Sequence, residues 1–467
     1  MLISAFMAQK RRRRVRVGFV ALGCPKNVVD SERMLAEIVQ AGFLLCAEPE
    51  NGDVVVINTC GFIAPAQAEA LEAVERVARA KRAGRVKKII VAGCLPQRLG
   101  RGLFDKADSI DAIVGLGQRD NIARIIEETV YRDGQAAYLD ESNDAVANED
   151  RKGRTVCAKV HDDRVRLRIS PAHWAYLRIS EGCSHRCSFC TIPAIRGPFR
   201  SKPEELVLGE AAELVSAGAV ELNLIGQDTT NYGRDRKMQD ALPGLLHELE
   251  RIAGLAWIRL LYAYPAGVSE RLIKTIANSD KIVHYIDIPI QHISNEVLKA
   301  MRRPDSKEDI CALIEKLRAV IPDVVLRTTV IVGFPGESDS QFAELVEFIE
   351  WARFDALGCF KFYAESGTAA ARMPGQIPET VKEQRVEQLM LAQQKIAFAR
   401  NNRRLGSRLT CLVDSVDSAG TARARFYGQA PEIDSTCIIN NCSVGPGRFV
   451  ETRVMGTKDY DLVVEQI

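Results

Sequence analysis

Residues 178–197 read Arg178-Ile-Ser-Glu-Gly-Cys183-Ser-His-Arg-Cys187-Ser-Phe-Cys190-Thr-Ile-Pro-Ala-Ile-Arg196-Gly197, with three cysteines four and then three residues apart. Thiolates this close in one loop can converge on one metal centre. Three of them on a cluster of four irons leave the fourth iron open to a small molecule. Zinc usually takes a fourth Cys or His, and His185 would more naturally point elsewhere. The spacing therefore favours an iron–sulfur cluster, with zinc and a disulfide as the less favoured alternatives.

The composition of the chain is that of a globular protein. Its 467 residues are enough for roughly two to four domains. The net charge of +2 gives no global reason to expect nucleic-acid binding. Two basic segments, residues 11–14 and 151–170, could contact RNA, but a charge run is more often a solvated face.

The chain has thirteen cysteines and no clear secretion signal, which favours metal ligands and buried thiols over disulfides. Residues 11–14 and the apolar run 17–23 loosely resemble a twin-arginine or lipoprotein signal, but the run is short and fits a buried strand better. No stretch reaches the roughly 20 apolar residues of a membrane helix. We therefore expect a cytoplasmic protein with no membrane association.

A second pattern lies towards the amino terminus, where three apolar strands each end in a cysteine. The strands are predicted over 15–23, 53–59 and 88–93, and the cysteines are Cys24, Cys60 and Cys94. Helices are predicted between them at 28–41 and 66–83. This alternation predicts a doubly wound parallel sheet, completed by a strand at 111–117 and a helix near 120–130.

The carboxyl ends of parallel strands lie along one edge of a sheet, so the three cysteines should meet in one crevice. A single cysteine at such a place is more often a buried thiol with no function. Three at the same topological place favour a shared role. We assign residues 15–130 to this domain, residues 1–14 to a basic disordered lead and residues 131–170 to a linker.

Strands and helices alternate again over residues 171–402. The predicted strands are 175–181, 220–226, 257–264, 285–291, 324–333 and 356–363, and the predicted helices are 203–217, 241–252, 269–279, 306–321 and 338–353. Six such units predict an open, partial (β/α)6 barrel, with functional groups at the carboxyl ends of its strands. The three-cysteine loop follows the first of these strands.

A long helix is predicted at 378–403. After it, the apolar residues recur at every second position. Short strands are predicted at 409–416, 421–427, 436–439 and 448–454, which indicates a small antiparallel β-barrel over 403–467. Residues 404–467 hold seven basic and eight acidic residues. A surface that reads phosphates is normally basic, so this segment favours a protein partner.

The loop pattern Cys-x3-Cys-x-aromatic-Cys resembles the radical S-adenosylmethionine (SAM) superfamily. Glu181-Gly182 before it and Ile192-Pro-x-x-Arg196-Gly197 after it are similar to the methylthiotransferase family. The sequence motifs around the first three cysteines also resemble that family. They are Gly23-Cys24-Pro-Lys-Asn27, Asn58-Thr-Cys60-Gly and Ala92-Gly-Cys94-Leu. Residues 403–467 resemble its TRAM module, in the version found in the branch that modifies a ribosomal protein.

The resemblance implies two 4Fe-4S clusters. One binds SAM and is held by Cys183, Cys187 and Cys190; the other carries the sulfur to be transferred and is held by Cys24, Cys60 and Cys94. It implies no catalytic residue beyond the cluster ligands and places Phe189 beside the adenine of SAM. We further expect SAM to contact Gln227, Asp228 and Gly333, each of which could equally be a turn residue. We assign no role to His292.

The implied activity inserts a methylthio group at the β-carbon of an aspartate in small-subunit ribosomal protein twelve, with flavodoxin or ferredoxin as electron donor. A side-chain base cannot remove a hydrogen from this unactivated carbon, which favours a radical. One alternative is a tRNA adenosine methylthiotransferase with the same clusters. Another is a non-catalytic iron–sulfur or RNA-binding sensor, with one labile cluster and no cleavage of SAM.

Overall fold

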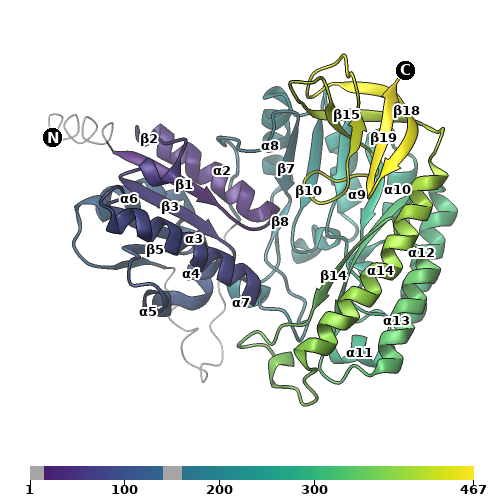
Figure 1. The fold of residues 1–467 in the computed structure, drawn as a ribbon, viewed down its shortest axis with the longest axis horizontal. Coiled ribbons are helices and arrows are strands. Elements are labelled where there is room, and N and C mark those ends of the chain that lie inside the picture. The colour runs from purple at the N-terminus through teal and green to yellow at the C-terminus, as the bar shows by residue number, and fades with distance from the viewer. Residues whose placement is uncertain (1–14, 140–159) are drawn as a thin grey trace. The chain divides into compact units, whose positions relative to one another are not determined.

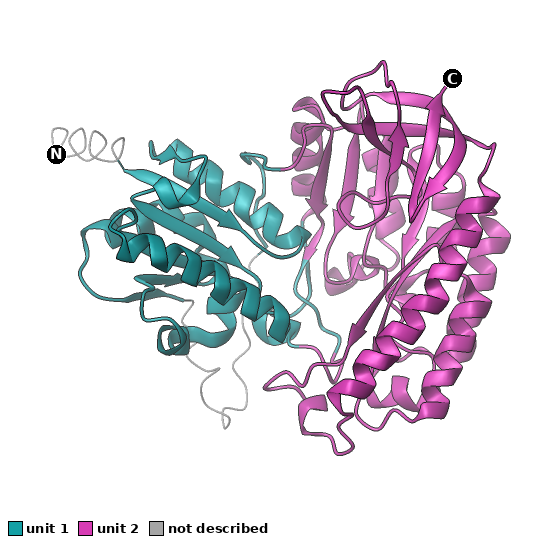
Figure 2. Ribbon diagram, viewed as in Figure 1, with its two compact units in different colours: residues 1–169, 181–185, 191–202 teal, residues 170–180, 186–190, 203–467 magenta. Residues whose placement is uncertain are grey.

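The computed structural model describes residues 15–139 and 160–467 (Figure 1), so the expected lead and residues 140–159 of the expected linker lie outside it. The chain forms two compact units (Figure 2). Unit 1 comprises residues 1–169, 181–185 and 191–202, and unit 2 comprises residues 170–180, 186–190 and 203–467. Within the described ranges, none of the helices has the length and hydropathy of a membrane span.

Unit 1 is built on a six-stranded parallel sheet with the order β2-β1-β3-β4-β5-β6. Its strands are β1 (Arg16–Ala21), β2 (Leu44–Leu45), β3 (Val54–Thr59), β4 (Lys88–Gly93), β5 (Ala112–Val114) and β6 (Ala136–Tyr138). Its helices are α2 (Pro25–Gln40), α3 (Ala64–Arg82), α4 (Cys94–Leu99), α5 (Leu103–Lys106), α6 (Ile122–Tyr131) and α7 (Ile192–Arg196). The prediction of a doubly wound parallel sheet is confirmed.

The central strand β3 shows why the sheet is covered on both faces. All six of its residues are buried, as expected of an apolar, β-branched strand in a doubly wound sheet. Val55 and Ile57 belong to one hydrophobic core, whereas Val54 and Val56 belong to another. Since successive side chains of a strand point to opposite faces, these two cores lie on the two sides of the sheet.

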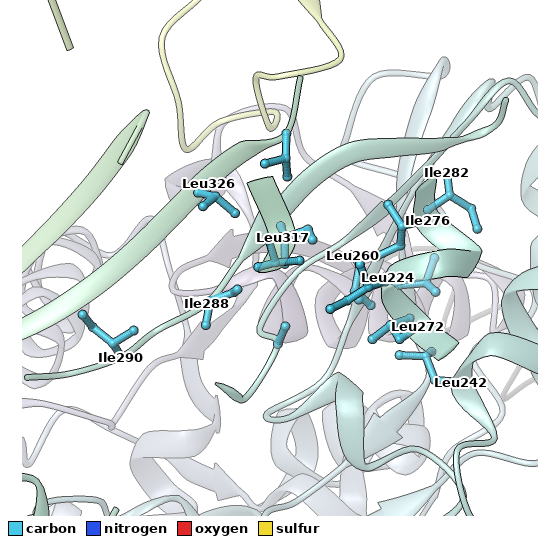
Figure 3. Packing of buried hydrophobic residues seen from close by; sticks show 14 of the residues in the cluster. Leu224, Leu242, Leu260, Leu272, Ile276, Ile282, Ile288, Ile290, Leu317 and Leu326 are labelled. Carbon is cyan, nitrogen blue, oxygen red and sulfur yellow. The ribbon is translucent and has the colours of Figure 1, made fainter. Parts of the chain in front are cut away.

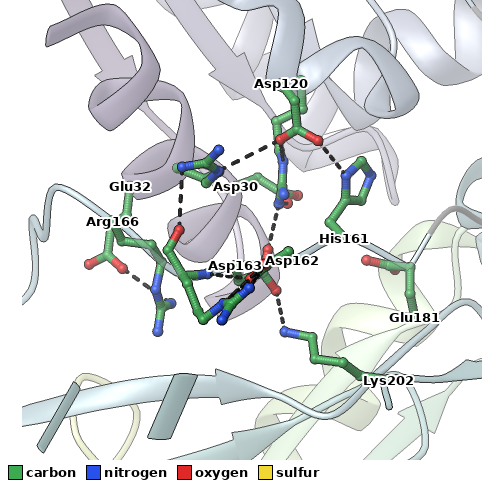
Figure 4. A network of polar contacts seen from close by, with 12 residues as sticks. Asp30, Glu32, Asp120, His161, Asp162, Asp163, Arg166, Glu181 and Lys202 are labelled. Atoms are coloured by element: carbon green, nitrogen blue, oxygen red, sulfur yellow. Dashed lines mark hydrogen bonds and ion pairs between the residues drawn. The ribbon is translucent and has the colours of Figure 1, made fainter. Parts of the chain in front are cut away.

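Part of the expected linker belongs to unit 1. Residues Ala136–Tyr138 form the edge strand β6, paired with β5. Towards the other end of the linker, Leu167 donates its backbone N–H to the carbonyl of Glu32 in α2 at 3.0 Å. Arg166 also forms an ion pair with the Glu32 carboxylate at 3.3 Å (Figure 4).

Unit 2 contains a six-stranded parallel sheet with the order β14-β13-β12-β11-β10-β7. The strands are β7 (Trp174–Arg178), β10 (Glu221–Ile225), β11 (Trp257–Leu260), β12 (Ile282–Asp287), β13 (Val325–Val332) and β14 (Ala356–Lys361). The helices are α8 (Glu204–Ser216), α9 (Leu242–Glu250), α10 (Glu270–Ala277), α11 (Asn295–Ala300), α12 (Lys307–Val320) and α13 (Asp339–Ala352). Two short strands, β8 (Ser180–Glu181) and β9 (Arg200–Ser201), pair separately.

The core of unit 2 forms where apolar strand residues meet the apolar faces of the helices. Leu224 and Leu260 of the sheet belong to the same buried cluster as Leu272 and Leu317 of the helices (Figure 3). The predicted partial (β/α)6 barrel is confirmed. Helix α11 was not predicted, since its six residues are too few to show a helical period.

Strands β11 and β12 end earlier than predicted, at Leu260 and Asp287. Apolar, buried residues continue past both strand ends, and the prediction therefore extended the strands too far. Tyr262 and Gln291, however, have left-handed backbone conformations, with φ of 59° and 72°. These conformations turn the chain at the carboxyl ends of the two strands.

The carboxy-terminal part is a closed barrel with the strand order β15-β16-β17-β19-β18, preceded by the long helix α14 (Glu379–Arg403). The strands are β15 (Arg408–Val416), β16 (Ala422–Phe426), β17 (Cys437–Ile439), β18 (Phe449–Lys458) and β19 (Asp461–Gln466). The predicted small barrel is confirmed, but β19 was missed. A tight turn at Asp459, with φ of 53°, joins it to β18.

Buried ion pairs attach this barrel to the parallel sheet of unit 2. The guanidinium of Arg425 in β16 lies 2.7 Å from the carboxylate of Glu221 in β10 and 2.7 Å from that of Asp414. Glu221 also pairs with Arg259 at 2.9 Å, and both side chains are fully buried. Removing one partner would leave the other charge buried without compensation, so these pairs fix how the barrel sits on the sheet.

Candidate functional site

The three cysteines of unit 1 come together at the carboxyl edge of its sheet, as predicted. Strands β1, β3 and β4 are neighbours in register, with Ala21 opposite Asn58 and Thr59 opposite Gly93. Cys24 follows β1 after two residues, Cys60 directly follows β3, and Cys94 directly follows β4 and begins α4. The parallel sheet thus places all three in one crevice.

Burial raises the pKa of the Cys94 thiol to about 12, although the Arg196 guanidinium acts in the opposite direction. The nearby Cys24 and Cys60 raise it further. Burial also raises the pKa of Cys60. With no metal bound, Cys94 is therefore a neutral thiol at neutral pH, and binding a metal centre would release its proton.

Glycines let the cysteine-bearing loops approach one another. Gly23 has a φ of 100°, and a Cβ atom there would lie 2.9 Å from the Cβ of Cys60. A Cβ atom on Gly61 would lie 2.9 Å from the carbonyl oxygen of Cys94. Any larger residue at either position would push two cysteine loops apart. Gly23 and Gly61 are therefore required by the close approach of the cysteine-bearing loops.

Asn27, on the first turn of α2, links the three strand ends. Its side-chain amide N–H groups donate to the carbonyls of Leu22 at 3.1 Å and Thr59 at 2.9 Å, which lie just before the first two cysteines. Its Oδ1 atom lies 3.6 Å from the Cys94 sulfur, within reach of the thiol as donor. Asn27 is almost fully buried, so one side chain holds all three cysteine-bearing segments together.

Arg196, at the end of α7, is a second link. Its Nη2 atom lies 3.4 Å from the Cys94 sulfur and donates to Asn27 Oδ1 at 2.7 Å and to Asp30 at 3.2 Å. Its Nη1 atom donates to both carboxylate oxygens of Glu181, at 3.2 and 3.0 Å. Burial alone would lower the pKa of Arg196, but Cys94, Glu181 and Asp30 outweigh it and raise the pKa, so the side chain stays charged.

Figure 4 shows a network of charged side chains in unit 1 that includes Asp30, Asp163 and Lys202. Arg119 bridges Asp30 and Asp163, at 2.8 and 2.9 Å. Lys202 donates to the other oxygen of Asp163 at 2.7 Å. Asp30 thus has Arg119 as a counter-ion in addition to Arg196.

The donor set of the first crevice consists of three thiols with no histidine among them. Thiolates are the ligands of iron–sulfur clusters, and a cluster takes each thiolate on a different iron. In the described residues, no group of three or more His, Cys, Asp and Glu side chains is arranged to hold a single metal ion. The twelve cysteines that the structure describes are all free thiols. The residues present therefore fit a cluster.

The second cysteine loop spans the two units along the chain, with Cys183 in unit 1 and Cys187 and Cys190 in unit 2. All three are half-buried free thiols. Ser188 fixes the unit 2 part: its N–H donates to the carbonyl of Met301 at 3.0 Å and its hydroxyl donates to that of Ala300 at 2.8 Å. The assignment of these three cysteines to the SAM-binding cluster stays a prediction.

The residues expected to contact SAM lie in different surroundings within unit 2. Phe189 packs against a small apolar cluster that includes Phe334 and Met301. Asp228 is buried and accepts hydrogen bonds from the Thr230 hydroxyl at 2.6 Å and the Asn231 N–H at 3.3 Å. It therefore caps the turn that follows β10, and its contact with SAM stays a prediction.

Gly333 has a φ of 71°, and a Cβ atom there would lie 2.3 Å from the side chain of Lys382. Gln227 is half-buried just before Asp228. Burial lowers the pKa of His292 to about 3, and its Nδ1 atom accepts the N–H of Ser294 at 3.0 Å. His292 is therefore a neutral, structural histidine.

No role for Asn27, Asp30 or Arg196 was predicted from the sequence. Asn27 and Arg196 stand in the words quoted for the family, but they are 169 positions apart in the chain. Only the fold brings them together. The signal in the sequence for Asn27 and Arg196 was their position as polar residues within these family motifs.

Replacing Asn27 by alanine should lower the free energy of unfolding of unit 1 by about 2–4 kcal/mol: the buried Thr59 carbonyl loses its donor at about 1–3 kcal/mol, and the part-buried Leu22 carbonyl adds about 1 kcal/mol. Urea denaturation followed by circular dichroism measures this. The control is Asn121→Ala, since Asn121 is exposed and its amide donates to Gln118 at the surface. Its effect should stay within about 0.5 kcal/mol. Equal effects of the two substitutions would contradict the linking role of Asn27.

Three family models match the chain. They are Uncharacterized protein family UPF0004 over residues 16–115, Radical SAM superfamily over residues 177–349 and TRAM domain over residues 405–467. The second match implies SAM and a 4Fe-4S cluster.

Solved structures of the radical S-adenosylmethionine methyltransferase TsrM from Kitasatospora setae share the fold. The form with cobalamin and a 4Fe-4S cluster bound has a TM-score of 0.51 at 13% identity, covering 74% of this chain and 72% of that one. The form with tryptophan substrate and the SAM analogue aza-SAM has a TM-score of 0.54 at 12% identity, covering 87% and 79%. At these identities the likeness is one of fold alone.

Relatives with known names are similar over almost the whole chain. Ribosomal protein uS12 methylthiotransferase RimO of Geobacter sulfurreducens is 43% identical over 455 residues, which cover 97% of this chain and 98% of the relative. The RimO protein of Pelotomaculum thermopropionicum is 42% identical over 462 residues, covering 97% and 99%. The chain therefore belongs to the RimO family of ribosomal protein uS12 methylthiotransferases.

Proposed function

We propose that this chain inserts a methylthio group at the β-carbon of one aspartate of ribosomal protein uS12. The observation that carries the proposal is the convergence of Cys24, Cys60 and Cys94 at one sheet edge, in a chain that has a separate three-cysteine loop. The names of relatives that match over 97% of the chain support the substrate.

Two 4Fe-4S clusters would be held by the two sets of cysteines. Cys24, Cys60 and Cys94 would hold the sulfur-bearing cluster, and Cys183, Cys187 and Cys190 would hold the cluster that binds SAM. With both clusters and SAM bound, one SAM supplies the methyl group, a second supplies the radical that takes the substrate hydrogen, and the first cluster supplies the sulfur.

The chain's own residues position these groups. Ser188 ties the second cysteine loop to the end of α11, and Phe189 presents an apolar ring beside it for the adenine. Lys382 packs against the backbone of Gly333, which would stand beside SAM, and Asp228 caps the turn that follows Gln227. None of these residues acts as an acid or a base, because the reaction removes a hydrogen atom and not a proton.

The partners follow from the reaction. A flavodoxin or ferredoxin would supply the electrons, and the enzyme would act in the cytoplasm, where uS12 is made. The small barrel has nearly balanced charge, with seven basic and eight acidic residues over 404–467, which favours a protein target over tRNA.

The test is the intact mass of uS12 from bacterial cells that lack their own RimO and express this chain. We expect uS12 to gain one CH3S group in place of one hydrogen, and the tRNA from the same cells to stay unchanged. Cells with an empty vector are the control. A methylthio group on tRNA adenosine, with uS12 unmodified, would overturn the proposal in favour of the tRNA enzyme.

A further inference from the structure

Arg196 contacts Cys94 of unit 1 from a helix that follows the other cysteine loop. It ends α7, six residues after Cys190 in the chain. Its side chain is 4% exposed, and its Nη2 atom lies 3.4 Å from the Cys94 sulfur. A permanently charged guanidinium that is buried beside a sulfur atom requires an explanation beyond packing.

The carboxylates around Arg196 do not fully explain why its guanidinium is buried beside Cys94. Asp30 already has Arg119 as a counter-ion, at 2.8 Å. Glu181 binds the Nη1 atom of Arg196 through both of its oxygens, which fixes the plane of the guanidinium. The Nη2 atom is thereby aimed at Cys94 and Asn27. The two hydrogens of Nη2 thus serve three acceptors, which are the Asn27 oxygen, an Asp30 oxygen and the Cys94 sulfur.

We propose that Arg196 is a positioning residue that holds Cys94 as a cluster ligand through an N–H···S hydrogen bond and raises the reduction potential of the cluster bound there. The inference rests on the proposed function, which assigns a cluster to Cys24, Cys60 and Cys94. Hydrogen bonds to the sulfurs and the net charge around a cluster set its potential. A buried positive charge stabilises the reduced form, which carries one more electron, and so raises the potential.

Lysine should replace Arg196 only in part. It keeps the positive charge, but its single ammonium cannot hold Glu181 with one nitrogen while directing a second nitrogen to Cys94. The charge and the directed hydrogen bond can therefore be separated by comparing Arg196→Lys with Arg196→Gln.

The test is a redox titration of the first cluster, followed by electron paramagnetic resonance. The parent is the full-length chain with Cys183, Cys187 and Cys190 changed to alanine, so that only one cluster contributes to the signal. The matched control is Arg119→Gln, which removes another buried guanidinium from Asp30. Arg119 forms ion pairs with Asp30, Asp120 and Asp163. Iron content is measured for every variant.

We expect Arg196→Gln to shift the potential to a more negative value, and Arg196→Lys and Arg119→Gln each to shift it less. If Arg196→Gln loses its iron while Arg119→Gln keeps it, the Arg196→Lys titration decides, and a lowered potential supports the inference. An unchanged potential in both Arg196 variants, or an equal shift in Arg119→Gln, would overturn it.

The inference and the proposed function fail in different ways. If the parent binds no iron, both the cluster assignment and the role of Arg196 are wrong. If the potential shifts as expected while the unmodified enzyme leaves uS12 unchanged, the role of Arg196 stands and the proposed substrate is wrong.

Discussion

Replacing Cys187 by alanine should abolish both SAM cleavage and methylthio transfer while leaving the first cluster in place. The loop around Cys187 would then offer two thiolates, Cys183 and Cys190, which are too few to hold a cluster with one open iron. Without that iron SAM has no site for reductive cleavage, so 5'-deoxyadenosine and modified uS12 should both fall to background. Liquid chromatography of the nucleoside and mass spectrometry of uS12 measure the two products.

Iron analysis makes this prediction specific. Because one cluster of two is lost, the iron content should fall by about half, to about four atoms per chain. The control is Cys311→Ala: Cys311 is a half-buried free thiol on α12, outside both cysteine sets, and its loss should leave iron and activity unchanged. Retained 5'-deoxyadenosine formation in Cys187→Ala would show that this loop does not bind the SAM cluster.

Replacing Cys94 by alanine should separate the two activities. The crevice of unit 1 would lose one of its three ligands, and with it the hydrogen-bonded contacts to Asn27 and Arg196. The second loop keeps its three cysteines, so SAM should still be cleaved to 5'-deoxyadenosine. Transfer of the methylthio group to uS12 should fall to background, because the sulfur-bearing cluster is missing. The same two product measurements test this.

The control for Cys94 is Cys46→Ala in the same unit. Cys46 is half-buried, and its backbone N–H, which the substitution keeps, donates to the carbonyl of Val17 at 3.0 Å. Both activities should survive in Cys46→Ala. Loss of 5'-deoxyadenosine formation in Cys94→Ala would mean that the two sets of cysteines do not act as separate centres.

The positions of the six cysteines relative to strands and loops could be predicted from the sequence. Apolar runs such as Val54–Thr59 are long enough to mark buried parallel strands, and the edge of a parallel sheet is a fixed place for whatever follows each strand. The convergence of Cys24, Cys60 and Cys94 followed from that topology alone.

The contacts within the site could not be predicted in this way. Arg196 and Asn27 meet because α7 and the start of α2 are brought together in unit 1, and no local period encodes that meeting. Polar side chains such as Asp228 are equally ambiguous, because a carboxylate at a strand end can bind a ligand or cap a turn. Its hydrogen bonds to Thr230 and Asn231 show that it caps a turn, and its contact with SAM stays a prediction.

The most direct test of the proposed function is fragmentation mass spectrometry of uS12 after reaction with the purified enzyme. The enzyme is reconstituted without oxygen and supplied with reductant, sulfide and SAM that carries a deuterated methyl group, with uS12 and tRNA present together. The account predicts one deuterated methylthio group on the β-carbon of a single aspartate of uS12. A deuterated methylthio group on tRNA adenosine, or SAM cleavage with neither substrate modified, would contradict it.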